Sequence, residues 1–143
     1  MNRPDPGTAG SSGGKARRGR CVLIMVVDDD PELRGAIRLL LPKQYEVIGL
    51  AGGEEFLEMV QAYQPDLIIL DVQLPGRDGF ALCRELRGRA DFRRIPILFL
   101  TALDEAVGFP RSLKADGDAY LTKPFDPREL LAAVGRLLDD AAQ

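Results

Sequence analysis

The stretch DLIILD at residues 66–71 runs directly into VQLPG at residues 72–76, and this junction decides the fold. A short, unbroken apolar run of this kind is typical of a strand buried on both faces, and Asp71 lies at its carboxyl end. The stretch CVLIMVVDDD at residues 21–30 repeats the pattern. The carboxyl ends of parallel strands meet at one edge of a sheet, so both strands deliver acids to the same place. Carboxylates that lie close together repel one another, and a bound divalent cation usually neutralises this repulsion.

Outward from these two strands, apolar strand patterns alternate with amphipathic helix patterns. We predict strands over residues 22–27, 46–50, 67–70, 95–100 and 119–122, and helices over 32–41, 54–62, 80–87 and 127–138, with a less regular helical piece between 105 and 115. Asp30 and Asp126 precede two of the helices and are predicted to cap them. Because the strands are continuous apolar runs, the fold class is α/β, a doubly wound five-stranded parallel sheet covered on both faces.

The chain has 143 residues, 45% of them hydrophobic, which suits one domain with a single core. Residues 1–20 are rich in Gly, Ser and Pro and hold five Lys or Arg against one Asp, so we expect a disordered basic tail of charge +4. Residues 21–143 form the predicted domain and hold fourteen Lys or Arg against twenty-one Asp or Glu, a charge of −7. This acidic balance argues against direct binding of nucleic acid.

The two cysteines, Cys21 and Cys83, are far apart in the sequence, and the chain contains no histidine. A Cys/His metal set or a Cys–His catalytic pair is therefore excluded, and we predict two buried, reduced thiols. No apolar stretch approaches the roughly 18 residues that cross a bilayer, and the amino terminus lacks the pattern of a signal peptide. We expect a cytoplasmic protein without membrane insertion.

Polar residues at the predicted carboxyl edge carry the chemistry, although each also has a plain structural explanation. Asp28 and Asp29 could merely cap a helix, and Asp71 could merely form a turn. Thr101 is a common type of strand residue, and a lysine such as Lys123 is usually a solvated charge. Their joint occurrence at separate strand ends favours a functional site.

Four strings in this chain closely resemble the receiver domain of two-component response regulators. They are VVDDDP at residues 26–31, LDVQLPGRDG at 70–79, FLTA at 99–102 and YLTKPF at 120–125. The resemblance spans residues 21–138, and the combination is far more specific than any single string. It implies a flavodoxin-like sheet with strand order 2-1-3-4-5, an order taken from receivers and not worked out from the residues.

The resemblance also implies a phosphoacceptor and a metal site. Asp71 would accept a phosphoryl group from a histidine kinase or a histidine phosphotransfer protein. The carboxylates of Asp29 and Asp71 and the backbone carbonyl of Gln73 would bind Mg²⁺. Asp28 would support the ion through water. Such a protein assists its own phosphorylation and dephosphorylation and is not a turnover enzyme.

Further residues are assigned by the same resemblance. Lys123 would place positive charge, and Thr101 a hydroxyl, against the phosphoryl oxygens. The Lys123–Pro124 bond is the expected site of a cis peptide. Thr101 and Tyr120 would act as a switch that alters the face formed by the fourth helix, the fifth strand and the fifth helix, where a downstream target protein would bind.

Two other functional classes compete with phosphotransfer. A receiver fold could serve as a docking module that is independent of phosphorylation, although every reactive position is filled. A haloacid-dehalogenase-like phosphatase also begins from an Asp at a strand end, but it expects a second acid two residues later, where this chain has Gln73. The chain ends soon after the last predicted helix, so it would be either a single-domain shuttle or a fragment of a longer protein.

Overall fold

The computed structural model describes residues 21–102 and 118–142. Its centre is a five-stranded parallel sheet in the order β2-β1-β3-β6-β7. The strands are β1 (Leu23–Val27), β2 (Glu46–Leu50), β3 (Leu67–Asp71), β6 (Ile97–Ala102) and β7 (Ala119–Lys123). Counted along the main sheet alone, this is the order 2-1-3-4-5, so the predicted fold class and strand order are confirmed.

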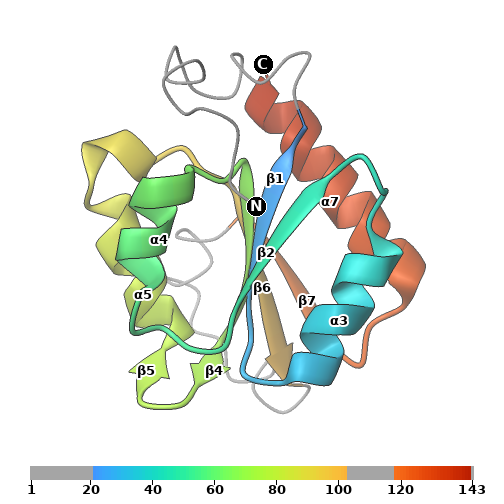
Figure 1. The fold of residues 1–143 in the computed structure, drawn as a ribbon, viewed down its shortest axis with the longest axis horizontal. Coiled ribbons are helices and arrows are strands. Elements are labelled where there is room, and N and C mark those ends of the chain that lie inside the picture. Colours follow the sequence, from blue (N-terminus) through green and yellow to red (C-terminus); the bar gives the residue numbers. More distant parts are fainter. Residues whose placement is uncertain (1–20, 103–117, 143) are drawn as a thin grey trace.

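Helices cover both faces of the sheet (Figure 1). One layer holds α4 (Phe56–Tyr63) and α5 (Gly79–Arg87), and the other holds α3 (Pro31–Leu40) and α7 (Pro127–Ala142). All four were predicted, and the largest difference in bounds is at the end of α7, expected at residue 138. None of the helices in the described ranges is long and apolar enough to cross a bilayer. The predicted tail (1–20) and the predicted helical piece (105–115) lie outside the described residues.

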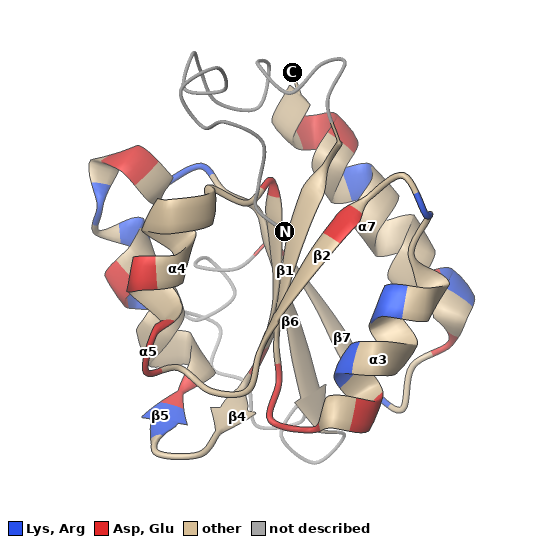
Figure 2. Cartoon of the chain, viewed as in Figure 1, with Lys and Arg blue, Asp and Glu red and all other residues tan. Residues whose placement is uncertain are grey.

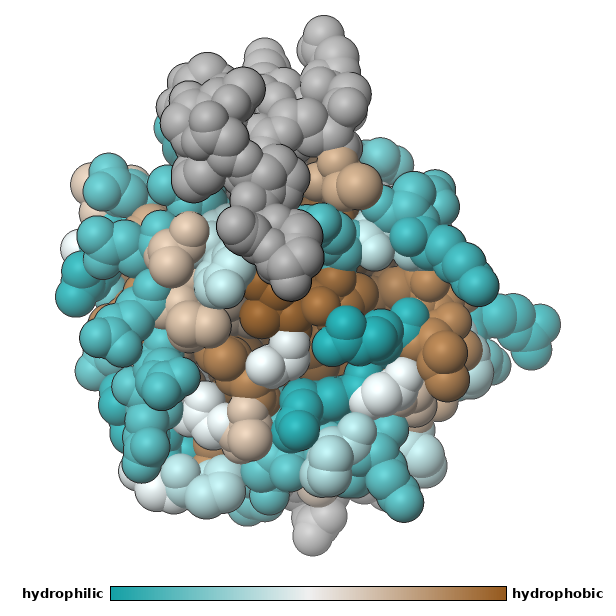
Figure 3. All heavy atoms as spheres, viewed as in Figure 1, coloured by the Kyte–Doolittle hydropathy of each residue, from teal (hydrophilic) through white to brown (hydrophobic). Residues whose placement is uncertain are grey.

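Side chains of the sheet alternate between two apolar layers, as the period of two in a strand requires. Met25 and Val27 pack in the α4/α5 layer, whereas Ile24 and Val26 pack in the α3/α7 layer. All residues of β1 are fully buried, which explains why the strand reads as an unbroken apolar run. Figure 3 shows apolar side chains on the face that carries the edge strand β2, flanked by hydrophilic side chains.

Both predicted helix caps are present. The Asp30 carboxylate accepts a hydrogen bond from the Glu32 N–H at 2.9 Å and caps α3. The Asp126 carboxylate accepts from the Arg128 N–H at 2.8 Å, while the Glu129 carboxylate accepts from the Asp126 N–H at 3.4 Å. These reciprocal bonds satisfy amide groups that the first turn of α7 would otherwise leave unpaired.

The segment after Asp71 is more ordered than the sequence indicated. Residues expected to form a loop make a small antiparallel hairpin of β4 (Gln73–Leu74) and β5 (Arg77–Asp78). Gly76 has a φ of 73°, which glycine adopts without strain, and the Pro75–Gly76 pair is the turn signal for this hairpin. A short 3₁₀ turn, η1 (Ala90–Phe92), was not predicted either.

One of the two cysteine predictions is wrong. Cys83 is buried, as expected, on the core side of α5. Cys21 is exposed, because β1 begins only at Leu23 and the first sheet pairing is made there. The apolar pattern that begins at Cys21 therefore starts two residues before the sheet does.

Candidate functional site

Three charged side chains meet at the carboxyl edge of the sheet because of strand alternation. Asp28, Asp71 and Lys123 each lie two positions after a residue of the α3/α7 layer, so they share that face of the sheet. The residues two positions earlier are, in the same order, Val26, Ile69 and Leu121. Figure 2 shows acidic residues at this edge, where the chain passes from β1 to α3.

The Lys123 ammonium bridges two carboxylates. Its Nζ lies 3.0 Å from Asp28 Oδ2 and 3.2 Å from Asp71 Oδ2. Asp28 is fully buried and Asp71 is 4% exposed. The second oxygen of each carboxylate accepts a backbone N–H, from Asp30 at 2.9 Å and from Gln73 at 3.1 Å. Both carboxylates are therefore held in fixed orientations, and the Lys123–Pro124 bond is cis, as predicted.

The environment of Asp71 favours the protonated carboxyl. Burial, and then the nearby charge of Asp28, raise the pKa of Asp71 from 3.8 to about 6, against the opposing effect of Lys123. Burial acts to lower the pKa of Lys123, but the hydrogen bond and charge of Asp28, together with Asp71, outweigh it and raise this pKa. Lys123 is thus charged at neutral pH, and its single positive charge does not balance the site.

Asp28, Asp29 and Asp71, which we call the acidic cluster, are placed to hold a cation. Each offers a carboxylate oxygen, and these oxygens all lie within 4.8 Å of one another. Among the described residues, Asp29 is exposed and makes no ion pair. Lys123 pairs with the other two carboxylates and is the positively charged side chain of the described residues that faces the cluster. Hard oxygen donors with excess negative charge fit Mg²⁺. Gln73 follows Asp71 closely in β4, and the role of its carbonyl stays a prediction.

Thr101 and Tyr120 belong to the opposite face of the sheet. Thr101 is fully buried next to Leu100, the β6 residue that pairs with Asp71, and its hydroxyl donates to the Ala102 carbonyl at 3.3 Å. The half-buried Tyr120 ring stacks on Phe99 with centroids 5.4 Å apart. A functional role for this pair stays a prediction, and the structure places both side chains on the α4/α5 side.

Gly79 contributes to the site and was not singled out from the sequence. Its N–H donates to the Val72 carbonyl at 2.8 Å, which brings the start of α5 against the backbone of Asp71 and Val72. A Cβ at this position would clash with the Asp71 carbonyl oxygen. The glycine therefore allows a close helix-to-strand approach behind the buried carboxylate, and its place after the cap Asp78 is the sequence signal for it.

The raised pKa of Asp71 predicts an unusual pH dependence of stability in metal-free protein. Between about pH 4 and pH 6 the folded state keeps a proton that the unfolded chain releases, so the free energy of unfolding falls as pH rises through this window. Asp71→Asn removes this effect. Urea unfolding in EDTA should show the variant gaining stability over the parent as pH rises, reaching about 3 kcal/mol above pH 6.

Asp78→Asn is the matched control, because it removes one carboxylate from the same loop and asparagine still caps α5. The gain of about 3 kcal/mol should not appear in Asp78→Asn, because this variant keeps Asp71. A difference between Asp71→Asn and the parent that is constant from about pH 4 to pH 8 would contradict the raised pKa.

Comparison with known proteins agrees with this geometry. The family model of the response regulator receiver domain matches residues 24–135 of this chain. The Cyanophora paradoxa protein named "Probable transcriptional regulator ycf27" is 41% identical over 116 residues, which are 80% of this chain and 47% of that protein. The chain thus spans about half the length of this curated relative.

Two solved structures share both the fold and about a third of the sequence. The chemotaxis response regulator CheY4 of Vibrio cholerae has a TM-score of 0.73 and 31% identity, covering 82% of this chain and 98% of that one. The receiver domain of a histidine kinase from Syntrophus aciditrophicus has a TM-score of 0.74 and 35% identity, covering 84% and 92%. With its acidic cluster at the carboxyl edge of the sheet, this chain belongs to the response regulator receiver domain family of two-component signalling.

Proposed function

We propose that this receiver domain accepts a phosphoryl group on Asp71 from the phosphohistidine of a histidine kinase or a histidine phosphotransfer protein, with Mg²⁺ at the acidic cluster. The observation that carries the proposal is the shared ammonium of Lys123, which reaches Asp71 and the fully buried Asp28 together. A plain ion pair needs one carboxylate. The acidic cluster holds three carboxylates, and Lys123 contacts two of them, so an excess of negative charge is left that suits a cation and a transferred phosphoryl group.

Asp71 is suited to act as the nucleophile. With a pKa of about 6, most of its carboxyl is ionised at pH 7, by about ten to one. In the transfer, a carboxylate oxygen forms a bond to phosphorus while the phosphorus–nitrogen bond to the donor imidazole breaks, and the bonding electrons leave with that nitrogen. The hydrogen bonds to Asp71 from the Gln73 N–H and from Lys123 hold the carboxylate in place during the attack.

The attack joins two anions, so the site must cancel charge. When bound by Asp29, Asp71 and the Gln73 carbonyl, with Asp28 in support, Mg²⁺ would supply positive charge to the phosphoryl oxygens. Lys123 supplies a further fixed charge from the side of β7. The Thr101 hydroxyl would exchange the Ala102 carbonyl for a phosphoryl oxygen.

The consequence of phosphorylation would be read on the β7 side of the domain. Thr101 follows the β6 residue paired with Asp71, and the Tyr120 ring packs on Phe99 of the same strand. Movement of the Thr101 hydroxyl would therefore be transmitted to Tyr120 through β6. A downstream target protein would bind the face that includes β7 and α7, and the acidic charge of the domain makes a protein a better candidate than nucleic acid. We place this signalling step in the cytoplasm.

The decisive experiment treats the protein with acetyl phosphate and Mg²⁺ and measures the intact mass. A gain of one phosphoryl group, lost again with hydroxylamine, is the expected result. Beryllofluoride with Mg²⁺ should shift the amide NMR signals of residues near Asp71. No mass gain together with no spectral change would favour the alternative, a docking module that works without phosphorylation.

A further inference from the structure

The Arg34 side chain reaches from α3 to the backbone of the acidic cluster. Its Nη1 donates a hydrogen bond to the carbonyl oxygen of Asp28 at 2.7 Å. Arg34 is half-buried, because it lies three residues before the buried Ile37 and so borders the apolar face of α3. The contact links the helix to the Asp28–Asp29 peptide, which carries two of the three carboxylates.

The Asp28 carbonyl lies where the sheet ends. The Asp28 N–H donates to the Leu50 carbonyl at 3.0 Å, but the pairing of β1 with β2 stops one residue earlier, at Val27 and Leu50. In a continued parallel ladder, the N–H of Gly52 would donate to the Asp28 carbonyl. The chain instead turns toward α4, and the Arg34 guanidinium donates to that carbonyl.

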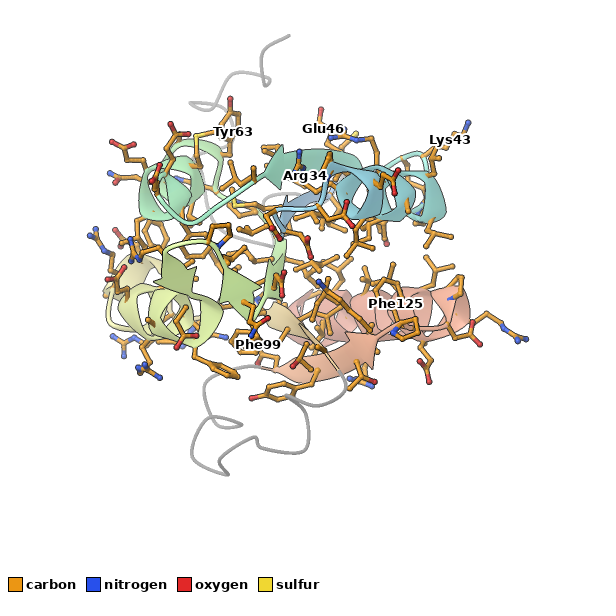
Figure 4. All side chains as sticks on the ribbon, turned by 90° about the horizontal axis from the view of Figure 1, so that it is seen from below. Arg34, Lys43, Glu46, Tyr63, Phe99 and Phe125 are labelled. Carbon is orange, nitrogen blue, oxygen red and sulfur yellow. The ribbon has the colours of Figure 1, made fainter. Side chains whose placement is uncertain are left out.

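Gly49 gives the Arg34 side chain room to pass over β2. A Cβ at Gly49 would lie 3.1 Å from Arg34 Cδ and 3.3 Å from Arg34 Nε. Figure 4, which views the carboxyl ends of the strands, shows Arg34 between α3 and the β2 edge. A glycine inside a strand weakens it, so its presence here is explained by the arginine that it accommodates.

We propose that Arg34 is a positioning residue for the acidic cluster. The Asp28 carbonyl and the Asp29 N–H belong to one planar peptide unit, so the hydrogen bond from Arg34 fixes the direction in which the exposed Asp29 leaves the sheet. The Asp28 side chain is fixed separately, by the Asp30 N–H and by Lys123. Arg34 thus sets the position of Asp29 toward Mg²⁺, an inference that rests on the proposed function.

Arg34→Ala and Arg38→Ala form a matched pair for the test. Arg38 lies one turn further along α3 and donates to the Val47 carbonyl of β2 at 3.0 Å, away from the acidic cluster. Each variant loses one positive charge and one hydrogen bond to a backbone carbonyl. Loss of positive charge near carboxylates would by itself tighten Mg²⁺ binding, so weaker binding identifies the positioning role.

Mg²⁺ affinity is measured by titration of amide NMR signals in metal-free protein. Arg34→Ala should weaken Mg²⁺ binding about 10-fold, as loss of a group that orients a metal ligand does, whereas Arg38→Ala should bind as the parent does or slightly tighter. The Asp29 amide signal, which comes from the peptide unit that Arg34 holds, should also shift in Arg34→Ala before any metal is added, and should stay unchanged in Arg38→Ala.

Gly49→Val is a second test that keeps every charge. The added side chain would displace Arg34, so Mg²⁺ binding should weaken as in Arg34→Ala even though valine suits a strand better than glycine. Unchanged or tighter Mg²⁺ binding in both Arg34→Ala and Gly49→Val, with normal binding in the parent, would overturn the inference alone. A parent that binds no Mg²⁺ would overturn the proposed function and the inference together.

Discussion

Asp71→Asn is expected to take up no phosphoryl group from acetyl phosphate, a loss of more than about 1,000-fold in rate, while Asp78→Asn is labelled like the parent. The reason is chemical. An amide lacks the anionic oxygen that attacks phosphorus. Of the two carboxylates that contact Lys123 in the described residues, Asp71 retains 4% exposure whereas Asp28 is fully buried. Intact mass after incubation with Mg²⁺ and acetyl phosphate measures the loss.

The Asp78 control separates chemistry from folding. Its carboxylate lies in the same loop but accepts the Phe80 N–H at 2.9 Å and caps α5, a task that asparagine performs equally well. Phosphoryl uptake by Asp71→Asn at the rate of the parent would remove Asp71 as the acceptor. Uptake at Asp28 or Asp29 would show that the acidic cluster reacts but that the acceptor is wrongly assigned.

The fold was predictable because the strands are buried on both faces. A run such as residues 66–71 has no polar alternation, and only a sheet covered by helices on each side accommodates it. The order of the strands came from the family resemblance. Local rules also placed the caps Asp30 and Asp126 correctly, since capping depends only on neighbouring residues.

The residues of the site were predictable for a related reason. Parallel strands all end at one edge, so a carboxylate that closes an apolar run must lie near the others. This reasoning brought Asp28, Asp71 and Lys123 together, and the structure confirms that they meet. How they share charge was not predictable, because Lys123 is 95 residues from Asp28 in the sequence and its reach to both carboxylates depends on the finished sheet.

Other features depend on tertiary packing that no local pattern encodes. The contact of Arg34 with the Asp28 carbonyl depends on the end of β1 lying beside α3, which the sequence of the helix does not show. Gly79 reads as a helix start until the Asp71 carbonyl is seen behind it. Cys21 was wrongly expected inside because an apolar run does not say at which residue pairing with the next strand begins.

Lys123→Met is expected to have opposite effects on metal binding and on phosphorylation. Without the ammonium, the fully buried Asp28 faces Asp71 with no counter-charge from β7, so Mg²⁺ should bind more tightly. Phosphorylation should nevertheless slow by about 100-fold, because the fixed positive charge on the transferred group is lost. Amide NMR titration measures the first effect, and mass gain with time measures the second.

Stability supplies a third, independent measurement on Lys123→Met. The Lys123 side chain is 30% exposed, so its loss should cost less than that of a fully buried ion pair, about 2 kcal/mol in EDTA at neutral pH. Mg²⁺ should restore more stability to the variant than to the parent, because the ion replaces the missing charge. Lys43→Met is the control, since Lys43 is exposed and points away from the domain, and it should change none of the three quantities (Figure 4). Metal affinity and phosphorylation falling together in Lys123→Met would mean that the lysine shapes the acidic cluster and does not supply charge to the transferred group.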